Sequence, residues 1–156
     1  MAGLVYELNS RLDMKEDIRV VQGVTSSISA AASLGAPLMH DFCQISLSDL
    51  MTDWSLIEKR LELASMADFV ICIYNPKSKG RPNHLRRAFE IMKTHKPATT
   101  PVGIVKNAGR INEEKYIRTL ETMDFEVCDM STMIIVGNKE TYIDGDKIIT
   151  PRGYGI

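Results

Sequence analysis

Apolar residues recur along the chain at two spacings, one typical of helices and one of buried strands. Leu85, Ala88, Phe89 and Met92 follow one another at three- and four-residue steps, which predicts an amphipathic helix. The segment 68–74 is a nearly continuous apolar run, which is typical of a strand covered on both faces. Shorter apolar runs predict further strands at 18–21, 42–47, 101–105 and 133–136.

Two more helices and a hairpin complete the pattern. Thr25 and the serines after it suit a helix start, and Gly35 and Pro37 suit its end. Apolar positions from Trp54 onward predict a second helix. The run 144–146, Asp-Gly-Asp, lies between two short apolar stretches and predicts a β-hairpin. Strands that alternate with helices and end in an antiparallel tail predict an α/β fold with a mixed sheet flanked by helices.

The opening of the chain is a helix pattern without an entry signal. Leu4, Val5, Leu8 and Leu12 form an apolar stripe that begins almost at the first residue, and no capping residue precedes it. Such a stripe is expected either at a loose terminus or in the middle of a longer element.

Composition narrows the class of protein. The 156 residues are 44% hydrophobic and 25% charged, with a net charge of -1, which are values of an ordinary globular domain. A pI near 6.3 argues against binding of nucleic acid or a membrane surface. No signal-peptide pattern and no apolar run near the ~18 residues of a membrane span is present. Cys43, Cys72 and Cys128 form no Cys-x-x-Cys pair, so we expect a reducing, cytoplasmic setting without disulfides or a metal site.

Candidate chemistry lies in the loops that follow predicted strands, because ligands of open α/β sheets bind at the carboxyl ends of the strands. The loop 23–26 offers a glycine turn, hydroxyl groups and the free N–H groups of a helix start, although an ordinary capped helix has the same pattern. The loops 74–81 and 106–110 and the C-terminal segment carry cations that suit an anionic ligand, with a solvated basic rim as the alternative. These cations are Lys77, Lys79, Arg81, Lys106, Arg110 and Arg152.

The three histidines are far apart in the sequence and predict no metal cluster. We interpret His84 and His95 as solvated positions on a helix. His40 is different because it precedes Asp41 in a loop.

Several of these runs resemble the tetrapyrrole methylases. The segment 20–27, Val-Val-Gln-Gly-Val-Thr-Ser-Ser, resembles their Val-Val-Pro-Gly-Ile-Thr-Ala motif, with Gln22 in place of proline. The runs 74–82, 101–110 and 150–154 look like those of the precorrin-3B or cobalt-factor III C(17)-methyltransferases. The Gly-Asp-Pro-Gly loop of that family does not occur in the chain. The resemblance therefore implies a remnant of the N-terminal methylase domain at 1–38, its last strand and helix, and a C-terminal methylase domain at 39–156.

The resemblance also implies ligands and a homodimer. S-adenosylmethionine would serve as methyl donor, and the six cations would hold the carboxylates of a tetrapyrrole that is methylated at carbon 17 with ring contraction, in cobalamin biosynthesis. The residues implied at the cofactor are Thr25, Ser26, Tyr74, Asn75, Gly103, Ile104 and Pro151.

Proton transfer in such a reaction needs an acid or base, and two interpretations of the chain stay open. His40 and Asp41 are the expected catalytic pair, with Asp49 next, although His40 could equally be solvated and Asp41 a polar residue at a strand entry. The chain is expected to be the C-terminal portion of a methyltransferase. The alternative is a non-catalytic module for tetrapyrrole binding or assembly.

Overall fold

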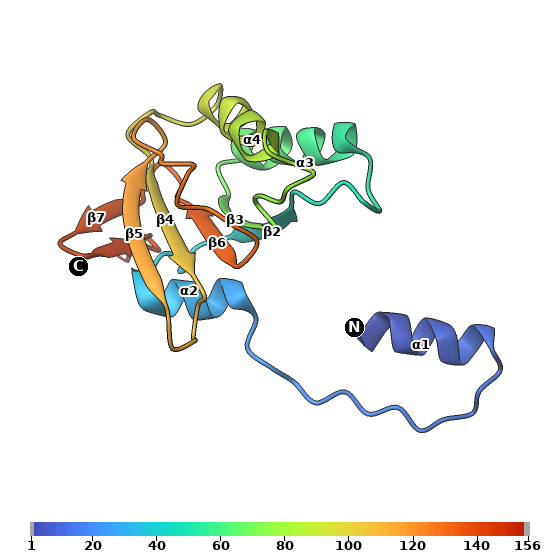
Figure 1. The fold of residues 1–156 in the computed structure, drawn as a ribbon. Coiled ribbons are helices and arrows are strands. Elements are labelled where there is room, and N and C mark those ends of the chain that lie inside the picture. Colours follow the sequence, from blue (N-terminus) through green and yellow to red (C-terminus); the bar gives the residue numbers. More distant parts are fainter. Residues whose placement is uncertain (1, 155–156) are drawn as a thin grey trace.

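A five-stranded mixed sheet lies at the centre of the protein, and the computed structural model describes residues 2–154 (Figure 1). The strands follow the order β2, β3, β6, β4, β5 across the sheet. β2 and β3 are parallel, and β6 is antiparallel to both β3 and β4, so that β2, β3 and β4 all run the same way. β5 is antiparallel to β4. The bounds are β2 Phe42–Ser46, β3 Val70–Tyr74, β4 Pro101–Lys106, β5 Glu114–Thr119 and β6 Thr132–Val136.

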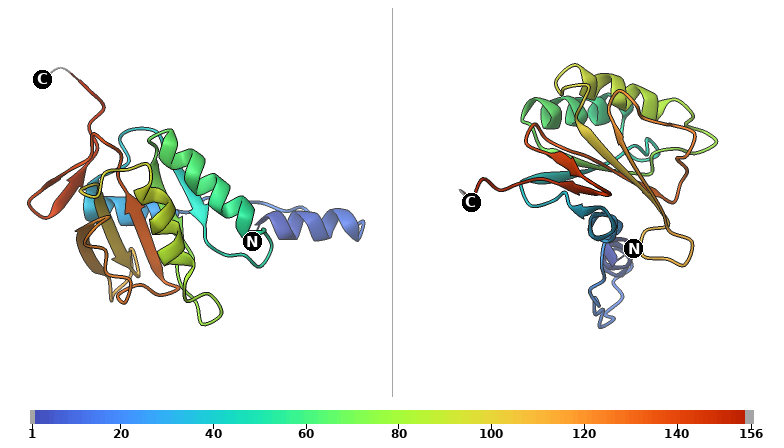
Figure 2. Two further views of the ribbon diagram at one scale, coloured as in Figure 1. Left: turned by 90° about the horizontal axis from the view of Figure 1, so that it is seen from above. Right: turned by 90° about the vertical axis from the view of Figure 1, so that its left-hand side faces the viewer.

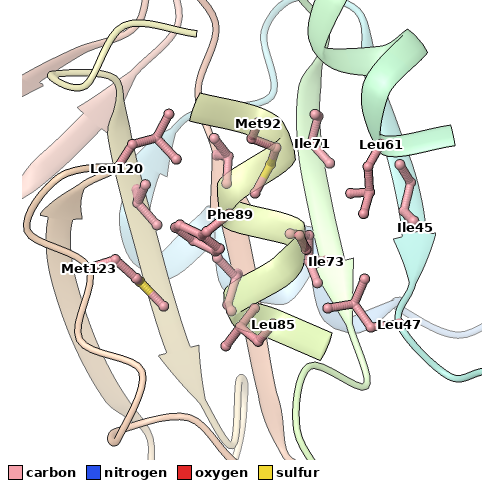
Figure 3. Packing of buried hydrophobic residues seen from close by; sticks show 14 of the residues in the cluster. Ile45, Leu47, Leu61, Ile71, Ile73, Leu85, Phe89, Met92, Leu120 and Met123 are labelled. Atoms are coloured by element: carbon pink, nitrogen blue, oxygen red, sulfur yellow. The ribbon is translucent and has the colours of Figure 1, made fainter. Parts of the chain in front are cut away.

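Helices cover both faces of this sheet. α3 (Trp54–Met66) and α4 (His84–Lys93) lie on one face, and α2 (Ser26–Leu34) lies on the other (Figure 2). The apolar stripe of α4 is buried, and Phe89 and Met92 face Ile71 and Ile73 of β3 in the larger of two apolar clusters (Figure 3). The predicted α/β fold with a mixed sheet flanked by helices is therefore confirmed.

A small second sheet sits beside the large one, at the end where β2, β3 and β4 begin. β1 (Gly35–Ala36) pairs with β8 (Lys147–Ile149), and β8 pairs with β7 (Tyr142–Asp144) through the predicted hairpin. Gly145 has a φ of 56° at the turn, which a glycine adopts without steric cost.

The N-terminal segment lies away from this body. α1 (Ala2–Arg11) forms as its apolar stripe predicts, yet it buries none of its side chains. The strand expected at 18–21 is wrong, because this stretch pairs with no strand and Val21 is 90% exposed. Among residues 2–154, no helix has the length and apolar character needed to cross a bilayer.

Two further differences from the sequence prediction concern β5 and residues 26–38. β5 was not expected, because its charged residues give no apolar run; it is an edge strand, which tolerates them. Leu34 of α2 is fully buried among residues of β3, β4 and β6, and β1 pairs with β8. The domain division at residue 38 stays a prediction, and in this structure residues 26–38 pack with the sheet rather than with 2–25.

We expect Gly137→Ala to destabilise the junction of the two sheets. A Cβ at Gly137 would lie 2.6 Å from Cβ of Thr141, whose hydroxyl is bonded to Asn138 and, at 2.8 Å, to Thr150. Overpacking of this kind costs about 1–3 kcal/mol in the free energy of unfolding, measurable by urea denaturation. Gly80→Ala is the matched control, since nothing lies within 4 Å of its Cβ position. Equal stability of the two variants would contradict the predicted clash.

Candidate functional site

The carboxyl ends of β2, β3 and β4 meet at one edge of the sheet, which we call the carboxyl edge. Ser46, Tyr74 and Lys106 end these strands, and the ladder places Lys106 opposite both Thr132 and Glu114. α3 and α4 follow β2 and β3, so their N-termini also lie there. α2 begins beside Tyr74 as well, because Ser26 and Tyr74 line the same cleft. The opposite edge, where β2, β3 and β4 begin, is the amino edge.

A cleft of about 380 Å³, here the Tyr74 cleft, opens at the carboxyl edge. It brings together Ser26, Tyr74 and Asn75, three of the expected cofactor residues, with the expected substrate residue Arg110. Thr25 precedes Ser26 as the N-cap residue of α2, and its side chain makes no capping hydrogen bond. The rest of the lining is Asn107, Ala108, Met130, Ser131, Thr132 and Met133.

Two asparagines shape this cleft through unusual backbone angles. Asn75 and Asn107 follow β3 and β4 directly and have φ values of 54° and 51°, in the left-handed region that asparagine tolerates better than most residues. The Asn75 amide donates to Oγ of Ser46 at 3.1 Å, and the Asn107 amide donates to the carbonyl of Asn112 at 3.1 Å. Each strand therefore turns sharply at its end and leaves Tyr74 on the wall of the cleft.

The start of α2 contributes polar groups that lack partners in the described chain. The first N–H groups of a helix have no carbonyl acceptor within the helix, and they carry partial positive charge. Within residues 2–154, Oγ of Ser27 is buried and has no hydrogen-bond partner. Ser26 lines the cleft in the same turn. This end of the cleft thus suits a carboxylate or another anionic group.

A second cleft of about 550 Å³, here the Lys79 cleft, adjoins the first. The two share Met130 and Ser131 in their walls. Lys77, Lys79 and Pro82 form its other side, with Cys128 and Asp129 opposite. A ligand larger than either cleft could occupy both.

The six expected cations differ in exposure and in whether an acidic side chain pairs with them. Lys79 and Arg110 are exposed and have no side-chain hydrogen bond or ion pair among residues 2–154. Lys77 donates to a carboxylate oxygen of Glu126 at 3.1 Å. Lys106 lies 3.3 Å from Asp129, whose hydrogen bond and charge raise the pKa of the lysine. Lys79 and Arg110 are thus the cations most available to an anionic ligand.

Arg81 differs from the other expected cations, because its guanidinium is buried. Its Nη1 donates to the Leu47 carbonyl at 2.7 Å, and its Nε donates to Oγ of Ser78 at 3.1 Å. Its Nη2 lies 3.8 Å from Sδ of Met130, in the wall shared by both clefts. Arg81 therefore joins the loops after β2 and β3 to the segment before β6, and only 9% of its side chain is exposed to a substrate.

Gly103 and Ile104 are not at the cleft. Gly103 lies in the middle of β4, where a Cβ would approach Cδ1 of Leu34 to 2.4 Å. Ile104 is fully buried in the cluster under α3 and α4. The glycine at 103 allows α2 to pack closely on the sheet, and neither residue lines the Tyr74 cleft. Their expected contact with adenosine stays a prediction.

His40, Asp41, Pro151 and Arg152 lie at the amino edge. His40 and Asp41 immediately precede β2, so the length of that strand, roughly 15 Å, separates them from Ser46. Arg152 shares a cleft of about 300 Å³ with both of them, and Pro151 is its half-buried neighbour. The structure therefore does not bring the expected catalytic pair to the Tyr74 cleft.

An aspartate–histidine pair at the carboxyl edge was not recognised from the sequence. His84 was interpreted as solvated, but its Nε2 lies 2.9 Å from Oδ2 of Asp49. Its ring centroid is 4.2 Å from that of Trp54. The one signal for this pair was Asp49, the second choice for a catalytic acid or base.

Two of the three cysteines are buried, and the described part of the chain holds no group of metal-ligating side chains. Burial raises the pKa of Cys72 and of Cys128 to about 12, so both thiols stay protonated. Between residues 2 and 154, no three His, Cys, Asp or Glu side chains are grouped as metal ligands.

Comparison with known proteins gives one consistent result. The model of the Tetrapyrrole (Corrin/Porphyrin) Methylases matches residues 1–124. A probable cobalt-factor III C(17)-methyltransferase of Salmonella typhimurium is 58% identical over 154 residues, which are 99% of this chain and 64% of the relative. A precorrin-3B C(17)-methyltransferase of Sinorhizobium sp is 45% identical over 143 residues, 88% of this chain and 56% of the relative. The chain thus spans less than two-thirds of the length of these relatives.

Two solved structures of methyltransferases superpose on this chain. The methyltransferase CobJ superposes with a TM-score of 0.89 at 33% identity, over 96% of this chain and 63% of that one. A cobalt precorrin-4 methyltransferase, CbiF, superposes with a TM-score of 0.68 at 23% identity, over 88% of this chain and 59% of its own, and indicates the fold alone.

We expect Arg81→Lys to lower stability although it keeps the positive charge. A lysine has a single nitrogen and does not span the Leu47 carbonyl, Ser78 and Met130, so buried acceptors lose their donor. The expected loss in the free energy of unfolding is about 1–3 kcal/mol. Arg86→Lys is the control, because Arg86 is exposed on α4. A stability loss no larger than that of the control would show that Arg81 does not hold these loops.

Proposed function

The chain belongs to the tetrapyrrole methylase family, and we propose that it acts in the S-adenosylmethionine-dependent methylation of precorrin-3B or cobalt-factor III at carbon 17. This reaction, with its ring contraction, is a step of cobalamin biosynthesis. The observation that carries the proposal is the pair of adjoining clefts at the carboxyl edge, of which one holds a helix N-terminus and the other exposed lysine.

The Tyr74 cleft suits S-adenosylmethionine. The N-terminus of α2 with Thr25 and Ser26 would hold the carboxylate of the methionine moiety, and the buried Ser27 hydroxyl has hydrogen-bonding capacity to spare. Tyr74 and Asn75 would bind the adenosine. The bound molecule supplies a methyl group on a positively charged sulfur, which is already a reactive donor. The protein's part is then to position the acceptor carbon and to exclude water.

The Lys79 cleft suits the edge of a tetrapyrrole that carries carboxylates. Lys79 and Arg110 lie on the two adjoining clefts, and exposed cations bind carboxylates mainly through charge. Exposed apolar side chains nearby, Met130 among them, give a flat macrocycle a surface to rest on. Asp129 and Glu126 neutralise Lys106 and Lys77, which leaves Lys79 and Arg110 as the principal contacts.

We also propose a cytoplasmic homodimer. The three cysteines are free thiols, which suits a reducing compartment. The apolar stripe of α1 is exposed, with Leu4 and Leu8 at 53% and 47%, and such surfaces promote association.

Light scattering of the purified chain should give the mass of a dimer or larger species. Leu4→Ser with Leu8→Ser should shift it toward the 17.5 kDa monomer, whereas Glu7→Ser on the same helix should not. A monodisperse monomer of the unaltered chain would contradict the homodimer.

The proposed reaction is tested with methyl-labelled S-adenosylmethionine and cobalt-factor III. Label should appear in the macrocycle, with product identified by mass and absorption. Lys79→Ala should weaken binding of the macrocycle about two- to fivefold at low salt, as expected from the loss of one exposed ion pair, and the difference should fade as salt rises.

Lys93→Ala is the control for Lys79→Ala, because Lys93 is an exposed residue at the far end of α4. Binding of the macrocycle without transfer of label favours the non-catalytic binding module. Absence of both binding and transfer overturns the assignment.

A further inference from the structure

Asp49 and His84 form a fixed pair on the same edge as the two clefts. His84 is the first residue of α4, and Asp49 lies in the loop after β2. Nε2 of His84 lies 2.9 Å from Oδ2 of Asp49, and Trp54 of α3 packs on the ring at a centroid distance of 4.2 Å. The imidazole is thus held by a carboxylate on one nitrogen and by an aromatic ring on its face.

The other nitrogen of this ring is free. With the Nε2 proton donated to the carboxylate, neutral His84 has its lone pair on Nδ1, and no partner for that atom occurs among residues 2–154. The side chain of His84 is 21% exposed, so part of the imidazole ring is open to solvent. A histidine oriented by a carboxylate, with its second nitrogen open, is the usual arrangement of a general base.

The charges around the pair keep Asp49 ionised. The hydrogen bond to His84 lowers the pKa of Asp49, and Nε of Arg81 lies 3.8 Å from its Oδ1. On α4, Arg86 pairs with Glu126, and Arg87 pairs with Glu58 of α3 and with Glu90. The carboxylate is therefore available to orient the imidazole and to stabilise it when it takes up a proton.

The pair is connected to the cofactor cleft. Asp49 lies three residues after Ser46, the last residue of β2, whose hydroxyl accepts from Asn75. Arg81 reaches from Asp49 to Met130 in the cleft wall. The other titratable groups at this edge are lysines, arginines and carboxylates, together with Tyr74 and Cys128 in the walls of the clefts. Of the described residues at the carboxyl edge, His84 is the only histidine, the side chain that most often serves as a general base.

We propose that His84 is the base that accepts the proton released by methylation and that Asp49 is its positioning residue. This inference rests on the proposed function. Methylation at carbon forms a C–C bond from an electron pair of the macrocycle, and the C–S bond of the donor breaks with its pair left on sulfur. The methylated macrocycle then holds one surplus proton, which passes to Nδ1 of His84 and later to solvent.

Three histidines in the chain make the test selective. The imidazole ¹⁵N signals of His40, His84 and His95 can be followed separately in the labelled protein during titration with uroporphyrin, a stable tetrapyrrole polycarboxylate. The His84 signals should change saturably, while those of His95, in the turn after α4 at the amino edge, should not. Without ligand, neutral His84 should carry its proton on Nε2, and Asp49→Asn should mix the two tautomers.

The kinetic test uses His84→Gln in the labelled-methyl assay, with His95→Gln as control. His84→Gln should lower kcat about 100-fold or more, as for loss of a general base, with KM nearly unchanged. Uroporphyrin binding that leaves the His84 signals unmoved, or a His84→Gln variant with the kcat of the control, overturns this inference alone.

The remaining outcomes are equally decisive. Loss of kcat in His40→Gln with full activity in His84→Gln would return the role to the amino edge. No binding and no transfer by the unaltered chain would overturn the proposed function, and the inference with it.

Discussion

The carboxyl edge depends on the burial of one guanidinium. Arg81 donates to Leu47 and Ser78, contacts Met130, and lies 3.8 Å from Asp49. A buried cation is costly unless its donors are used, so the loops that supply these acceptors are constrained to stay where they are. Both clefts take part of their lining from those loops, and Asp49 lies in one of them. The hydrogen bonds of a single side chain therefore hold this part of the site in place.

A second buried cation fixes the opposite edge. Nζ of Lys96 donates to the carbonyls of Phe69 and Gly137 at 2.9 and 3.0 Å and lies 3.3 Å from Oδ1 of Asp68. Burial lowers the pKa of Lys96, while Asp68 acts in the opposite direction. Asp68 and Phe69 directly precede β3, and Gly137 directly follows β6. Lys96 therefore links the beginning of β3 to the end of β6. Each edge of the sheet is thus held by a buried cation, Arg81 at the carboxyl edge and Lys96 at the amino edge.

The sequence predicted the elements with strong local patterns and missed those that depend on neighbours. The apolar run of β3 and the stripe of α4 were sufficient by themselves. β5 was missed because an edge strand needs no apolar run, and the expected strand at 18–21 failed because no strand lies beside it. An apolar pattern shows only that a segment favours the strand conformation, whereas a β-ladder also needs a neighbouring strand to hydrogen-bond with.

The same distinction between local patterns and contacts with distant residues applies to the candidate site. Tyr74 and Asn75 lie at the Tyr74 cleft because they follow a strand, and His40 lies at the amino edge because it precedes one, while the roles expected for them stay predictions. In the sequence, Arg81 and Lys79 are two cations of one loop. Only the packing of the folded chain shows that Arg81 is buried and bonded to its neighbours, whereas Lys79 is exposed. The pairing of His84 with Asp49 spans 35 positions and two loops, which no local pattern encodes.

A chain with a net charge of -1 can still bind an anion, because the field at its carboxyl edge is set by orientation rather than by composition. α2, α3 and α4 all begin there, and each helix start carries partial positive charge. Acidic residues at the same edge are engaged: Glu113 accepts from the Gly109 N–H, and Asp129 pairs with Lys106. The free charges that remain, Lys79 and Arg110, therefore act in a positive local field.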